Sequence, residues 1–131
     1  MIIDASAMLA VLFAEADAIR FAAALKETPG KAMSAVNWFE VVIAIDRRGT
    51  EQQGTEFEGL LRRLGVEIVP FDAGQAAMAR VAYDMWGKGR HRAHLNMGDC
   101  AAYALARYRR EPLLFKGGDF ALTDIEPALK D

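Results

Sequence analysis

Two acidic residues follow short apolar segments that the sequence predicts as strands. Asp4 comes directly after residues 1–3, and Asp119 lies in a glycine-containing turn just after residues 112–115. The carboxyl ends of parallel strands meet at one edge of a sheet, where the ligands of such folds bind. We therefore expect both carboxylates at that edge, although Asp is also a common residue at helix caps and in turns.

Two further acids lie near the starts of predicted helices. Asp99 is in the first turn of an apolar helix, where free backbone N–H groups and the helix dipole favour an ionised carboxylate. Its spacing from Asn96 also fits an Asn/Asp version of the capping box, so a purely structural role stays open. Glu40 lies early in another helix, and its neighbours Ile43 and Ala44 favour a face that is not solvated, although polar residues on the same side also fit a Glu40 that faces water.

Carboxylates that converge in one cleft favour a particular chemistry. They repel one another and lose hydration, so their ionised forms are disfavoured unless a cation is present. Oxygen ligands without His or Cys beside them suit Mg²⁺ or Mn²⁺ rather than zinc. Because Mg²⁺ held by few carboxylates keeps sites for waters and substrate phosphates, these acids predict metal-assisted cleavage of a phosphodiester.

The composition is that of one globular domain, which we expect to span residues 1–131. The chain is 53% hydrophobic with a net charge of −2, so no general attraction to nucleic acid or membrane is expected and basic surface must be local. Cys100 is the single cysteine, which excludes an intrachain disulfide and favours a reducing compartment. The start lacks a signal-peptide pattern and no apolar run is long enough to span a bilayer. We expect a cytoplasmic protein.

Short apolar segments alternate with helical patterns along the whole chain. Strands are expected at 1–3, 31–34, 66–70 and 112–115, with a short edge piece at 124–129 at most. Helices are expected at 5–14, 16–26, 36–48, 51–64 and 73–86, and from the Asp99 segment to about 109. This alternation predicts right-handed crossovers and an α/β fold: a three-layer α/β/α domain with a short, mainly parallel central sheet.

The acids stand inside stretches that are similar to those of a known family. The stretches are Met1-Ile2-Ile3-Asp4-Ala5-Ser6, Ser34-Ala35-Val36-Asn37-Trp38-Phe39-Glu40, Gly87-Lys88-Gly89-Arg90-His91, Leu95-Asn96-Met97-Gly98-Asp99-Cys100, and Leu113-Leu114-Phe115-Lys116-Gly117-Gly118-Asp119-Phe120 with Thr123-Asp124-Ile125. Over essentially the whole chain, the sequence resembles PIN-domain ribonucleases, and specifically the VapC-type toxins of bacterial toxin–antitoxin pairs. The fourth and fifth stretches are the most specific.

The resemblance implies roles for individual residues. The acidic triad that holds the metal is implied to be Asp4, Glu40 and Asp99. Asp119 is implied as a fourth, more variable acid, and Ser6 and Asn96 as supports of the site through hydrogen bonds. Many relatives carry a further Asp where this chain has Gly117, so the fourth-acid role falls to Asp119 alone.

The resemblance also implies an activity and its partners. These are Mg²⁺- or Mn²⁺-dependent endoribonuclease activity, inhibition by a cognate antitoxin whose tail occupies the cleft, and a toxin homodimer. A basic segment before the Asp99 helix, together with one lysine near the last strand, supplies candidates for RNA phosphate contact, although a solvated loop explains the segment equally well. These candidates are Lys88, Arg90, His91, Arg92 and Lys116.

Three other functions fit parts of the pattern. A receiver-like phospho-signalling module also has Asp residues at strand ends, here Asp4 and Asp72, and a late lysine, here Lys116. It requires an acidic pair after the first strand, however, and leaves the other acids without a role. A phosphatase with an Asp nucleophile requires a second acid where Ser6 stands. A non-catalytic PIN-fold binding domain is disfavoured because all four acids are present.

Overall fold

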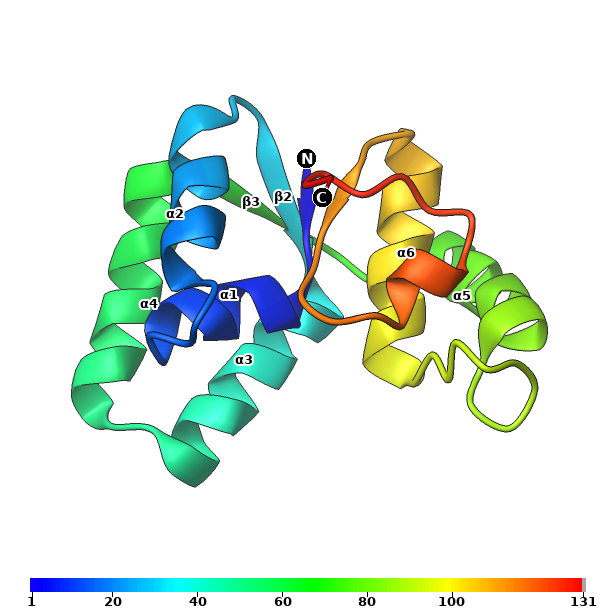
Figure 1. Ribbon diagram of the computed structural model, residues 1–131, viewed down its shortest axis with the longest axis horizontal. Helices are drawn as coiled ribbons and strands as arrows, with labels where there is room; N and C mark the ends of the chain where they lie inside the picture. The colour runs from blue at the N-terminus through cyan, green and yellow to red at the C-terminus, as the bar shows by residue number, and fades with distance from the viewer. Residues whose placement is uncertain (131) are drawn as a thin grey trace.

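The computed structural model describes residues 1–130, so that Asp131, the last residue of the expected domain, lies outside the described residues. Its centre is a sheet of four parallel strands in the order β3-β2-β1-β4 (Figure 1). The strands are β1 (Ile2–Ile3), β2 (Lys31–Ser34), β3 (Val66–Val69) and β4 (Leu113–Leu114). The predicted short parallel sheet is confirmed, and the expected strand at 124–129 is reduced to one isolated bridge between Leu113 and Pro127.

Helices cover the sheet on both sides. They are α1 (Ala5–Leu12), α2 (Ala18–Glu27), α3 (Ala35–Arg48), α4 (Glu51–Leu64), α5 (Ala73–Trp86) and α6 (Met97–Arg109), followed by a short 3₁₀ helix, η1 (Phe120–Leu122). Figure 1 shows α1 to α4 on one side of the sheet and α5 and α6 on the other. The predicted three-layer α/β/α architecture is therefore confirmed. Helix α1 ends two residues earlier than expected, and Ala14 has a φ of 49° that no helix continues through.

The two-residue strands divide their side chains between two cores. Ile3 and Leu114 are fully buried in the core beneath α1 to α4, whereas Ile2 and Leu113 are fully buried in the core beneath α6. This division follows from the pleat, because successive side chains of a strand point to opposite faces. Strands of continuous apolar residues are thus what a sheet covered on both faces requires.

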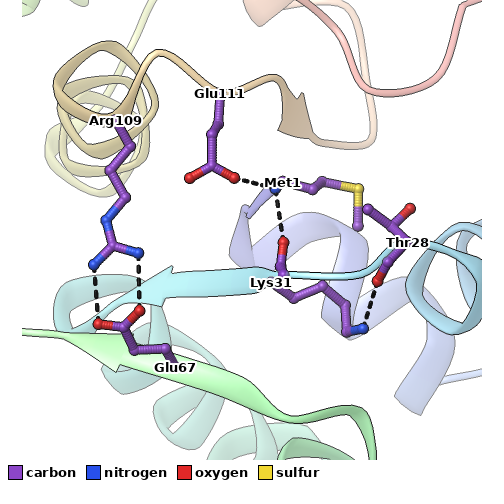
Figure 2. A network of polar contacts seen from close by, with 7 residues as sticks. Met1, Thr28, Lys31, Glu67, Arg109 and Glu111 are labelled. Atoms are coloured by element: carbon purple, nitrogen blue, oxygen red, sulfur yellow. Dashed lines mark hydrogen bonds and ion pairs between the residues drawn. The ribbon is translucent and has the colours of Figure 1, made fainter.

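The amino-terminal edge of the sheet is closed by polar contacts (Figure 2). Arg109, at the end of α6, donates two hydrogen bonds to Glu67 of β3, at 2.8 and 2.9 Å. The amino group of Met1 donates to the Gly30 carbonyl at 2.9 Å and pairs with Glu111. These contacts join the end of α6 and the segment after it to β3 and to the residues just before β1 and β2, at the edge that lies away from the predicted site.

The carboxyl edge is where the chain reverses its direction across the sheet. The chain passes from β1 to β2 to β3, and then α5 and α6 carry it back to β4 on the far side of β1. Such a switch point leaves a crevice outside the strand ends. Asp4 follows β1 and Asp119 follows β4, so both stand at this crevice. Within the described residues, no helix combines the length and apolar character that crossing a membrane demands.

Candidate active site

Asp4 is a buried carboxylate that caps α1. Its Oδ2 accepts hydrogen bonds from the Ser6 backbone N–H at 3.0 Å and from Ser6 Oγ at 2.5 Å. Ser6 Oγ in turn accepts from the backbone N–H of Lys116 at 2.9 Å, which links the site to the end of β4. Burial raises the pKa of Asp4 to about 6; the bonds from Ser6 oppose this rise, and repulsion from Glu40 adds to it.

Asp99 caps α6 and also lines a pocket with the other acids. Its Oδ2 accepts from the Asn96 backbone N–H at 3.0 Å, while Asn96 Oδ1 accepts from the Asp99 N–H at 2.8 Å, which completes a capping box on α6. The side chain also lines a pocket with Asp4 and Glu40. Burial raises the pKa of Asp99 to about 6, the Asn96 bond opposes the rise, and repulsion from Asp4 and Asp119 adds to it.

Glu40 is held by a residue that the sequence did not single out. The side-chain amide of Asn37, fully buried on α3, donates to Glu40 Oε1 at 2.8 Å and to the Gly98 carbonyl at 3.0 Å. A Cβ placed on Gly98 would lie only 2.1 to 2.4 Å from the carboxylate atoms of Glu40. The Glu40 side chain therefore occupies the space that Gly98 leaves open at the start of α6. Burial raises the pKa of Glu40, the Asn37 bond opposes the rise, and repulsion from Asp99 adds to it.

Asp119 stands at the margin of this group. It is exposed at the start of η1 and does not line the pocket, yet its charge contributes to the raised pKa of Asp99. Gly117, the position at which the family resemblance implied a further Asp, has a φ of 99°. That left-handed conformation favours glycine, so the absence of a further acid here fits the local backbone.

The pocket has a volume of about 480 Å³, and acidic, apolar and basic side chains line it. The three acids interact with one another through their charges, and α1 and α3 supply the rest of the lining. Its lining comprises Asp4, Ala5, Ser6, Leu9, Glu40, Ile43, Ala44, Arg47, Arg48 and Asp99. In residues 1–130, no ion pair involves Asp4, Glu40 or Asp99, so no salt bridge offsets their mutual repulsion.

The donor set limits how a metal can bind. Among the described side chains, no three His, Cys, Asp or Glu residues are arranged as a complete set of direct ligands. One oxygen of each acid of the pocket already accepts a hydrogen bond from the protein. An ion that binds one or two carboxylates directly and keeps several waters, as Mg²⁺ does, is compatible with this arrangement.

Most of the expected RNA contacts are engaged elsewhere in the protein. The Arg90 guanidinium lies 5.3 Å from the centre of the Tyr83 ring, and His91 packs edge-on against Trp86. Lys116 Nζ pairs with Glu15 at 2.6 Å rather than with the acids of the site. Like these three side chains, Lys88 and Arg92 are not part of the pocket lining.

A family model identifies this chain. The model of the PIN domain matches residues 1–126. The chain belongs to the PIN-domain family. The resemblance inferred from the sequence is thereby confirmed.

Curated relatives within the PIN-domain family match nearly the full length of the chain. It is 47% identical over 125 residues to "Ribonuclease VapC" of Mycolicibacterium smegmatis, covering 95% of this chain and 97% of the relative. Identity to "Ribonuclease VapC30" of Mycobacterium tuberculosis is also 47%, with 95% of each chain covered. "Ribonuclease VapC42" of the same species is 41% identical over 129 residues, with 98% of each covered.

Two solved structures share the PIN fold of this chain. The toxin VapC20 of M. tuberculosis, described as cleaving the sarcin–ricin loop, superposes with a TM-score of 0.78 over 95% of both chains at 15% identity. A chain of a toxin–antitoxin complex from Klebsiella pneumoniae superposes with a TM-score of 0.70, over 94% of this chain and 92% of that one, at 18% identity. At these identities the structural likeness concerns the fold alone.

Proposed function

We propose that this PIN-domain protein is a metal-dependent endoribonuclease, the toxin of a VapBC-type toxin–antitoxin pair. The observation that supports it most is the meeting of Asp4, Glu40 and Asp99 in one pocket, each with a raised pKa and, within residues 1–130, without a salt-bridge partner. Relatives at 41 to 47% identity that carry the name ribonuclease add support. A receiver-like module is not favoured, because Asp72 serves as the cap of α5 and accepts from the Gln75 N–H at 2.8 Å.

The proposed cofactor is Mg²⁺ or Mn²⁺. Asp4, Glu40 and Asp99 would hold the ion directly or through water, with Asp119 close enough to shape the charge of the site. When bound, such an ion activates water and stabilises the leaving oxygen of a phosphodiester. A divalent ion also offsets the repulsion that raises the pKa values of these acids.

The residues of the chain would prepare this site before substrate arrives. Ser6 fixes Oδ2 of Asp4, Asn37 fixes Oε1 of Glu40, and Asn96 fixes Oδ2 of Asp99. Each bond joins the acid to a helix start or helix interior, so the carboxylates are positioned by rigid elements rather than by loops. Such preorganisation reduces the reorganisation that binding and reaction require.

The proposed partners follow from the same assignment. They are RNA as substrate, a cognate antitoxin that blocks the cleft, and a second copy of the chain in a homodimer, all in the cytoplasm. On the basic segment before α6, Lys88 and Arg92 remain candidates for RNA contact outside the pocket, because Arg90 and His91 already pack against α5. The Klebsiella neighbour is itself a toxin–antitoxin complex, which supports the proposed antitoxin.

The proposal is tested by single replacements of the acids. Asp4→Asn and Asp99→Asn keep the size and the capping ability of the side chain while removing the charge. We expect both variants to remain folded and to lose metal-dependent cleavage of RNA by at least 100-fold, and to be harmless on expression where the wild-type protein arrests growth. Cleavage by both variants at the wild-type rate would exclude the assignment.

A further inference from the structure

Helix α3 forms one wall of the pocket, and the chemistry of this wall changes along the helix. Glu40 lies at the acidic end, Ile43 and Ala44 follow one turn later, and Arg47 and Arg48 follow after one more turn. All five line the same pocket, as the spacings of three, four, seven and eight residues require. Seven residues of helix correspond to about 11 Å along the axis. The groove therefore runs from acidic through apolar to basic.

The two arginines at the basic end are available to a ligand. Both are exposed, and within residues 1–130 no carboxylate pairs with either of them. The Arg48 guanidinium lies 4.4 Å from the centre of the Phe13 ring, which holds it at the rim. By contrast, Arg109 already forms a salt bridge with Glu67.

An acidic pocket alone repels a polyanion, so a nuclease needs cations that receive the strand on either side of the cleaved bond. A guanidinium presents a planar set of donors that matches the oxygens of a phosphate. Within residues 1–130 neither arginine pairs with Glu40, and the Arg48 guanidinium is held against Phe13, so the two ends of the groove offer separate places for a phosphate. The basic end is thus placed to receive a different phosphate of the same strand.

We propose that Arg47 and Arg48 form a binding subsite for an RNA phosphate that flanks the scissile one, with the sugar between the two lying over Ile43 and Ala44. This inference rests on the proposed ribonuclease function and adds the path of the substrate to it. The strand then runs along α3, whereas the segment at 87–94 takes no part in the pocket.

The same arginines also lie in the last turn of α3, where cations stabilise the helix dipole. A matched pair in this chain separates the two roles. Arg62 and Arg63 are adjacent arginines in the last turn of α4 and do not line the pocket. Replacing either pair by glutamine removes the same charge from the same kind of position, so a general electrostatic effect or a dipole effect appears equally in both double variants.

The experiment measures binding of a short single-stranded oligoribonucleotide as a function of salt concentration. It compares Arg47→Gln/Arg48→Gln with Arg62→Gln/Arg63→Gln, each in an Asp99→Asn background that keeps the RNA intact. Each phosphate contact to a single strand contributes about 0.7 to the slope of log K against log salt. We expect the slope to fall by about 0.7 to 1.4 for the α3 pair, with about tenfold weaker binding, and to remain nearly unchanged for the α4 pair.

Kinetics with the active-site acids intact provide the second measurement. We expect the α3 pair to raise KM about tenfold with little change in kcat, because a flanking contact is made equally in ground and transition states. Equal effects of the two pairs on binding, or an unchanged KM for the α3 pair in an enzyme that cleaves RNA, would overturn the subsite. Weakened binding of the antitoxin with unchanged RNA affinity would also overturn it. A wild-type protein that cleaves no RNA would instead contradict the proposed function itself.

Discussion

Replacing Gly98 with alanine is expected to displace Glu40 from the site while the fold is kept. The added Cβ would lie 2.1 Å from Oε2 and 2.4 Å from Oε1 of Glu40, well inside van der Waals contact. The carboxylate is the far end of a flexible side chain, so it moves in preference to the backbone. When it moves, it loses the 2.8 Å hydrogen bond from Asn37.

The two consequences for stability partly offset each other. A hydrogen bond to a charged group contributes about 1.5–3 kcal/mol, and the partial exposure of Glu40 places it at the lower end. Alanine in place of a helical glycine returns about 0.5–1 kcal/mol. The net loss in the free energy of unfolding is then about 1 kcal/mol, or about 4 °C in Tm. Misplacing an acid of the site by even an ångström is expected to lower kcat/KM by about 100-fold.

The assay combines thermal unfolding with cleavage of a defined RNA. Gly54→Ala in α4 is the control, because the nearest atom to its added Cβ would be Ile45 Cγ2 at an ordinary 3.9 Å. That variant is expected to gain stability and keep full activity. If Gly98 acts through Glu40, the Glu40→Gln/Gly98→Ala double variant is no less active than Glu40→Gln alone. Wild-type kcat/KM in Gly98→Ala would refute the reasoning.

Three further predictions concern the polar side chains Asp4, Ser6 and Asn37. Asp4 has a pKa of about 6 in the folded protein against 3.8 ordinarily, so the folded state binds more protons and loses stability as pH rises from 4 to 7. In metal-free protein, Asp4→Asn is therefore expected to raise the free energy of unfolding by up to about 3 kcal/mol at pH 7 and to have little effect below pH 4. Denaturant titrations at the two pH values measure this difference, and a gain of equal size at both would contradict it. Ser6→Ala removes a hydroxyl that donates to Asp4 and accepts from Lys116. We expect the free energy of unfolding to fall by about 1–2 kcal/mol and kcat to fall about tenfold or more. Unchanged kinetics would show that Ser6 is dispensable. Asn37→Ala removes the amide that links the Glu40 carboxylate to the Gly98 carbonyl. Activity is expected to fall although the charge of the acids is unchanged, and a variant as active as wild type would show that Asn37 does not position Glu40.

The elements of this fold could be predicted because their signals are local. The bounds of β2 and α4 agree with the sequence-based expectation, since a glycine marks one boundary of each: Gly30 precedes β2 and Gly65 follows α4. The strand-end positions of Asp4 and Asp119 followed from the parallel sheet, and the first turn of α6 indicated Asp99. The sequence left a capping role and a site role open for Asp99, and the two are compatible. Its Oδ2 accepts the capping hydrogen bond while the side chain also lines the pocket.

The parts that were not predicted depend on contacts between distant segments. Asn37 and Gly98 are 61 residues apart, and only the packing of α3 against α6 brings them together. The basic segment before α6 carries charge that is visible in the sequence, but the contacts of Arg90 and His91 with α5 are not. Arg47 and Arg48 lie at the end of the expected helix 36–48, a position that arginine often occupies without any binding role. Their spacing of seven and eight residues from Glu40 was the available signal for a shared face.

The central claim is that Asp4, Glu40 and Asp99 together hold a divalent ion. Calorimetric titration of metal-stripped protein with Mn²⁺ tests it most directly. We expect saturable binding by the wild-type chain and at least about tenfold weaker binding by Asp99→Asn, with the affinity of Arg62→Gln/Arg63→Gln unchanged. Absence of binding to the wild-type chain, or equal affinity in the Asp99→Asn variant, would contradict it.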